Sequence, residues 1–77
     1  METKMVDITL HIDETTTHAD REALRDRMLA QQGVMAASFH DDKPHLMIVE
    51  YNPDAIDSAR LVTIAKEAGV HAALVGL

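Results

Sequence analysis

The sequence predicts an α+β fold in which two helices cover one face of a four-stranded antiparallel sheet. Three observations support this prediction. The 77 residues have room for one core, strand-like and helix-like segments follow one another as strand, helix, strand, strand, helix, strand, and no linker-like segment interrupts them. Two strand-helix-strand halves with right-handed crossovers interlock as a ferredoxin-like βαββαβ sandwich with strand order 4-1-3-2. We therefore expect residues 1–77 to form a single domain.

The first half of the chain predicts a strand, a capped helix and a second strand. Apolar and polar residues alternate over residues 5–12, which is typical of a half-buried strand. Thr17, followed three residues later by Asp20, has the pattern of a capping box, so a helix should begin near residue 18 and continue to about residue 31. Gly33 follows it, and residues 34–40 predict the second strand.

The second half predicts a turn, a central strand, a helix and a last strand. Pro44 cannot donate to a strand ladder, so we expect a hairpin turn over residues 41–44. The third strand, residues 45–51, has apolar residues on both faces, which indicates a central position in the sheet. Helical spacing then follows, with Asp54 or Asp57 as the cap and Gly69 as the end. Finally, residues 70–77 predict the fourth strand.

The composition excludes several classes of function. Thirteen acidic and seven basic residues give a formal charge of -6, which repels a phosphate backbone, so nucleic acid is not an expected partner. The chain has no cysteine, which excludes disulfides, thiolate metal sites and thiol nucleophiles. No segment approaches the ~20 apolar residues that span a bilayer, so we expect a cytoplasmic protein without a membrane partner. No nucleophile with a base and orienter is recognisable, which predicts a binding module and not an enzyme.

Three short motifs resemble parts of the heavy-metal-associated domain of the copper-chaperone type. They are Gly33-Val34, the segment Val-Glu-Tyr-Asn-Pro at residues 49–53, and the segment Ala-Gly-Val-His-Ala-Ala-Leu at residues 68–74. They stand in the family's order, and the resemblance covers nearly the whole chain. It implies the ferredoxin-like fold and a function in metal binding.

The same resemblance implies a degenerate metal loop. Members of the family carry a Met-x-Cys-x-x-Cys loop between the first strand and the first helix, and its thiolates bind copper(I). In this chain Thr15 falls at the methionine, while Thr17 and Asp20 fall at the two cysteines. Because neither side chain is a soft ligand, we expect no thiolate-bound copper(I).

The predicted topology brings histidines to one end of the sheet. Strands one and two end where strands three and four begin, so His11, His40, His45 and His71 should lie at that end, with His18 in the adjoining loop. By alternation, His11 and His71 share the helix-free face of neighbouring strands. His40 belongs to the far edge strand. Alternation points His45 toward the other face of the sheet. We therefore predict a metal site formed by His11, His18 and His71.

Carboxylates in the predicted loops accompany these histidines, namely Asp13, Glu14, Asp20, Asp41 and Asp42. Imidazole and carboxylate donors suit zinc, nickel or copper(II). The alternative interpretation is that the histidines are separate, solvated side chains at strand ends. The absence of His-x-His or His-x-x-x-His spacing favours that alternative for any single histidine.

The helix-free face of the sheet supports a second hypothesis, a protein-interaction or regulatory domain with a degenerate metal loop. We expect Leu46, Ile48, Ala73 and Val75 to lie on that face. An apolar patch of this kind often marks a surface that forms a homodimer or docks on a protein partner, although a sheet also tolerates a few exposed aliphatic side chains. A small-molecule sensor of the ACT type is a third hypothesis, but residues 13–20 lack its usual glycine-bearing loop.

Overall fold

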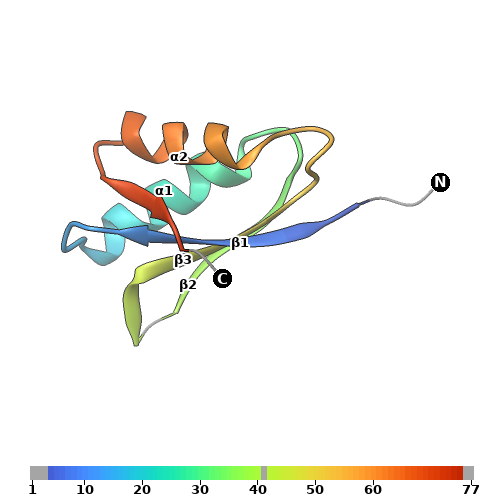
Figure 1. Cartoon of the computed structure of the whole chain (residues 1–77). Coiled ribbons are helices and arrows are strands. Elements are labelled where there is room, and N and C mark those ends of the chain that lie inside the picture. Colours follow the sequence, from blue (N-terminus) through green and yellow to red (C-terminus); the bar gives the residue numbers. More distant parts are fainter. Residues whose placement is uncertain (1–3, 41, 76–77) are drawn as a thin grey trace.

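The computed structural model describes residues 4–40 and 42–75. Its elements are β1 (Val6–Ile12), α1 (His18–Leu29), β2 (Val34–His40), β3 (Lys43–Tyr51), α2 (Ser58–Glu67) and β4 (Ala72–Leu74). The strands pair antiparallel in one sheet of order β2-β3-β1-β4, and both helices lie over the same face of it (Figure 1). This confirms the predicted α+β, ferredoxin-like topology and the central position of β3.

The hydrophobic core lies between the sheet and the helices and is almost entirely aliphatic. Alternate residues of the two central strands point into it, as the sequence pattern predicts. Tyr51 is the one aromatic residue among the buried residues that the structure describes. The others are Leu10, Ile12, Leu24, Met28, Ala37, Met47, Val49, Leu61, Ile64 and Ala65. Because the helices cover only one face of the sheet, the side chains on the other face are not part of this core.

Helix α1 begins where the capping-box pattern predicts. The Thr17 hydroxyl accepts the Asp20 N–H at 3.1 Å, and the Asp20 carboxylate accepts the Thr17 N–H at 3.0 Å, so two of the backbone amides at the helix start are satisfied. The helix ends at Leu29, two residues earlier than predicted. Within the described residues, neither helix has the length and hydrophobicity needed to cross a membrane.

Strand β3 begins at Lys43, two residues earlier than the sequence predicts, and contains Pro44. The register explains why the proline is tolerated there. Phe39 pairs with Met47, whereas His40 pairs with Lys43, so the β2–β3 hairpin is irregular around Pro44. On its other side, β3 pairs with β1 only as far as residue 46. The missing N–H of Pro44 therefore costs no ladder hydrogen bond, as is usual for proline at an irregularity of a sheet.

Strand β4 is shorter than the predicted residues 70–77, of which 76–77 lie outside the described part of the chain. The residues before it have other partners. The Val70 N–H donates to the carbonyl of Ala65 at the end of α2, and the backbone of His71 binds the loop before α1. Pairing with β1 continues one residue beyond β4, because the Val75 N–H donates to the Thr9 carbonyl at 2.9 Å.

Candidate functional site

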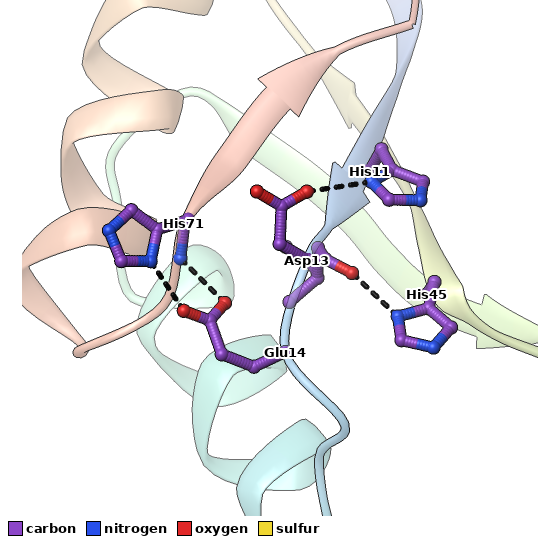
Figure 2. A network of polar contacts seen from close by, with 6 residues as sticks. His11, Asp13, Glu14, His45 and His71 are labelled. Atoms are coloured by element: carbon purple, nitrogen blue, oxygen red, sulfur yellow. Dashed lines mark hydrogen bonds and ion pairs between the residues drawn. The ribbon is translucent and has the colours of Figure 1, made fainter.

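The loop between β1 and α1 is joined to the start of β4 by the contacts of Glu14 and Asp13 with His71, which we call the Glu14–His71 clasp. One oxygen of Glu14 accepts the backbone N–H of His71 at 2.8 Å, and the other lies 2.5 Å from Nδ1 of its ring (Figure 2). The Asp13 N–H donates to the His71 carbonyl at 3.0 Å. Three contacts thus hold two loops that are far apart in the sequence.

The clasp shifts the pKa of both side chains toward their charged forms. The ring of His71, followed by its backbone N–H, lowers the pKa of Glu14 because both donate hydrogen bonds to the carboxylate. The hydrogen bond to Glu14 is also the main reason why the pKa of His71 is raised, and the charges of Glu14 and Asp13 add to it while Lys66 opposes it. The His71 side chain is 79% exposed, so water screens the pair.

A second cluster, formed by His11, Asp13 and His45, lies beside the clasp (Figure 2). Nδ1 of His11 lies 3.2 Å from the Asp13 carboxylate, and Nδ1 of His45 lies 2.6 Å from the carbonyl of Ile12. The two rings are stacked, with centroids 5.8 Å apart and planes 13° apart. Asp13 therefore belongs to both clusters, through its side chain here and its backbone in the clasp.

The position of His45 corrects the prediction that it points away from His11. That prediction assumed regular alternation along the third strand. Regular pairing between β1 and β3 ends at Leu46, and the β2–β3 hairpin is irregular at Pro44, so alternation does not fix the direction of His45. The hydrogen bond to the carbonyl of Ile12, the last residue of β1, orients the His45 ring instead. Sequence reasoning therefore missed one histidine of this cluster.

The three histidines predicted as metal ligands each hold a different carboxylate. His11 faces Asp13, His71 faces Glu14, and Nε2 of His18 lies 3.0 Å from Glu22 one turn further along α1. Across residues 4–40 and 42–75, no three histidine or carboxylate side chains are grouped so that they could hold a metal ion. His40, at the end of edge strand β2, pairs with Lys43, and Asp41 lies outside the described residues.

The residues at the family's cysteine positions do not fit copper(I). Thr17 and Asp20 are hard oxygen donors, and the capping box already occupies the hydroxyl of one and the carboxylate of the other. The Thr17 hydrogen bonds are also the cause of a lowered pKa of Asp20, which keeps that carboxylate charged as a helix cap. This loop is therefore a helix start and not a soft-metal site.

A pocket of about 390 Å³ opens on the helix side of the same loop. Its walls combine the loop, one side of α1 and the turn after α2: Glu14, Thr15, Thr16, Asp20, Ala23, Leu24, Arg27, Ala68, Gly69 and Val70. The volume is in the range of small-ligand sites. No sequence pattern predicts this pocket, because its walls come from segments that only the tertiary fold brings together.

The predicted apolar patch lies on the helix-free face, around His11 and Thr9 of β1. His11 pairs with Leu46 on one side and with Ala73 on the other. Thr9 pairs with Ile48, and its carbonyl accepts the Val75 N–H. Leu46 and Ile48 are half-buried, whereas Ala73 and Val75 are exposed. The patch therefore borders the His11–His45 cluster.

Comparison with known proteins identifies the fold but not a sequence relative. No family model matches the sequence, and no curated protein matches it. Among solved structures, the N-terminal domain of a potential copper-translocating P-type ATPase from Bacillus subtilis, in its Cu(I)-loaded state, superposes with a TM-score of 0.85 at 22% identity, covering 95% of this chain and 90% of that chain. Oxidized MerP from Ralstonia metallidurans gives 0.85 at 14% identity, covering 95% of this chain and 100% of that one.

The CopZ metallochaperone gives a TM-score of 0.80 at 12% identity, covering 88% of this chain and 100% of that chain. At these identities the similarity shows the fold alone. The resemblance to heavy-metal-associated domains is confirmed at that level, together with the absence of the two cysteines.

Proposed function

We propose that this chain is a small binding module that takes up zinc, nickel or copper(II) through imidazole and carboxylate groups and not through thiolates. The observation that carries the proposal is the gathering of five such side chains at one end of the sheet, from β1, β3 and the loops before α1 and β4 (Figure 2). They are His11, Asp13, Glu14, His45 and His71. A copper-binding domain of a P-type ATPase and the CopZ metallochaperone share the fold, which supports a role in metal handling.

The proposed ligands are those that the sequence predicts, His11, His18 and His71. His11 and His71 belong to these five side chains, whereas His18 is the first residue of α1. Nδ1 of His11 and of His71 each face a carboxylate, and no hydrogen bond within the described residues involves Nε2 of either ring. Nε2 is thus the atom that each ring offers to a metal. His18 uses Nε2 for Glu22, and ligation replaces that exposed contact, which is worth only about 0.2–0.5 kcal/mol between helical neighbours.

Metal titration of the full chain tests this function. We expect saturable changes in the histidine side-chain NMR resonances as zinc or nickel is added, with half-saturation below millimolar metal. His11→Ala and His71→Ala should weaken the binding, and His40→Ala serves as a matched control on the edge strand. The proposal fails if no histidine resonance moves below millimolar metal.

The apolar patch supports a second candidate function, a surface for self-association or for docking on a protein partner. Its four residues surround His11 and Thr9 on the face that no helix covers, and Val75 is 40% exposed. Light scattering of the wild type and of Ile48→Lys tests whether the chain associates with itself through this patch. A wild type that stays monomeric at high concentration contradicts self-association, whereas an oligomer that Ile48→Lys dissociates supports it.

A further inference from the structure

We infer that His11 and His45 form a two-imidazole metal site of their own on the helix-free rim of the sheet, with Asp13 and the Ile12 carbonyl as orienting groups. The inference rests on the proposed function, metal uptake through imidazole and carboxylate groups, and pairs His11 with His45 in place of His18 and His71. The site follows from the contacts of the two rings and not from sequence spacing. It includes His45, which regular alternation along β3 would place on the other face of the sheet.

The first observation is that both rings are already held through Nδ1. A carbonyl oxygen only accepts hydrogen bonds, so the contact to Ile12 places the Nδ1 proton on His45 and leaves the lone pair of the neutral ring on Nε2. The Asp13 carboxylate has the same effect on His11. Metal-ligating histidines almost always donate their other N–H to a carboxylate or carbonyl in this way. Within the described residues, neither Nε2 takes part in a hydrogen bond.

The second observation is the distance between the rings. An imidazole that binds at about 2.0–2.1 Å places its centroid about 3 Å from the ion, so two ligating rings have centroids roughly 5–6 Å apart. The observed separation between His11 and His45 is 5.8 Å. Because the planes are only 13° apart, one ring must turn about its Cβ–Cγ bond for both Nε2 atoms to meet one ion. That torsion is soft for histidine. The ring that turns gives up its Nδ1 contact, and the other ring stays held.

The third observation is access and charge. The His11 side chain is 48% exposed and His45 is half-buried, so an ion can reach both from solvent. The formal charge of the chain is -6, which favours a cation over an anion at this rim. Two imidazoles leave several coordination positions to water, and among the divalent ions such a nitrogen site binds copper(II) most tightly. We therefore expect copper(II) to bind more tightly than nickel or zinc.

Copper(II) titration of the full chain, followed through paramagnetic broadening of histidine resonances and nitrogen coupling in electron paramagnetic resonance, tests the inference. We expect the ring resonances of His11 and His45 to broaden together, at lower copper than those of His40 and His71. His45→Asn and His11→Asn keep an N–H near the Nδ1 position and remove Nε2, and each should weaken binding at least tenfold. Asp13→Ala removes the orienting carboxylate and should weaken binding about tenfold.

Matched controls separate this site from others at the same rim. His40→Asn should leave the copper affinity within about twofold, and dispersed amide spectra of every variant show that it folds. If copper binds but His45→Asn leaves the affinity unchanged while His71→Asn weakens it, the inference is overturned and the proposed function stands. If no histidine responds to copper, both are overturned.

Discussion

At the scale of single residues, Glu14 connects the two halves of the molecule with one carboxylate. It accepts hydrogen bonds from both the backbone and the ring of His71, and these contacts lower the pKa of Glu14 and raise that of His71. The raised pKa of His71 means that its contribution to stability is complete below the ordinary value of 6.5 and is lost as the pH rises through the folded-state pKa. The lowered pKa of Glu14 gives a contribution that is complete above 4.5 and lost as the pH falls through its folded-state pKa.

The pair therefore stabilises the fold most between about pH 4.5 and 6.5. We predict that Glu14→Gln lowers the pKa of His71 toward its ordinary value, because the main hydrogen-bond acceptor of the ring loses its charge. The stability difference between the wild type and this variant should be largest in that pH range and should narrow on both sides. NMR titration of His71 and thermal unfolding across pH measure the two effects. Glu22→Gln, which alters the partner of His18, should leave the titration of His71 unchanged.

The residue scale also shows where sequence reasoning reaches its limit. The prediction that His11 and His71 lie at one end of the sheet follows from strand order alone, and Figure 2 shows the two side chains at the same rim. Their actual partners, Asp13 and Glu14, depend on loop backbone conformations that no periodicity describes. His45 was misplaced because alternation does not apply beyond Leu46, where pairing with β1 ends.

At the scale of elements, the start of α1 is the boundary that the sequence predicts best. Thr17 and Asp20 satisfy each other's backbone N–H groups, and this local pattern needs no tertiary information. The end of the same helix, the start of β3 and the bounds of β4 were less well predicted, since they depend on pairing with distant segments. Pro44 is the clearest case, because only the register of the hairpin shows that its position requires no donor.

We predict that Thr17→Ala destabilises the protein by about 1 kcal/mol, because the Asp20 N–H loses its acceptor. Urea denaturation with an unchanged slope should report this loss as a lower midpoint. Thr15→Ala, in the same loop but outside the capping box, is the control and should change stability by less than about 0.5 kcal/mol. Equal effects of the two substitutions would contradict the role of the cap.

The two turn glycines give a second prediction at this scale. Gly33 and Gly69 both have positive φ, 97° and 93°, so alanine at either position is strained by roughly 1–2 kcal/mol. A Cβ at Gly33 would lie 2.7 Å from the Cβ of Ala55, whereas a Cβ at Gly69 meets nothing within 4 Å. Gly33→Ala should therefore cost clearly more than Gly69→Ala in urea denaturation. Similar costs would show that the loop of Ala55 moves aside freely.

At the scale of the whole molecule, one small aliphatic core supports the entire rim. Leu10 and Met47 pair across the two central strands and are fully buried, and the helices cover them from one side only. A domain of this length buries a smaller share of its surface than a larger one, so its stability is modest. The core face and the element types could be predicted from the periods of two and 3.6 residues. The strand order and the layers could be predicted from the right-handed crossovers of the two halves.

We predict that Met47→Ala destabilises the protein by about 2–5 kcal/mol, because it leaves a cavity between the sheet and the helices. Met35→Ala removes the same atoms from a side chain that is 57% exposed on edge strand β2, and it should change stability by less than about 0.5 kcal/mol. Thermal unfolding of both variants measures the difference. A Met35→Ala variant as unstable as Met47→Ala would contradict the position of the core.

The capping box closes the loop before α1 on its own backbone. A loop that closes on its own backbone needs neither a bound ion nor an electron donor to acquire its shape. Chelators and reductants should thus leave the first turn of α1 unchanged. Any ion that binds near this loop would therefore meet a helix start that is already formed.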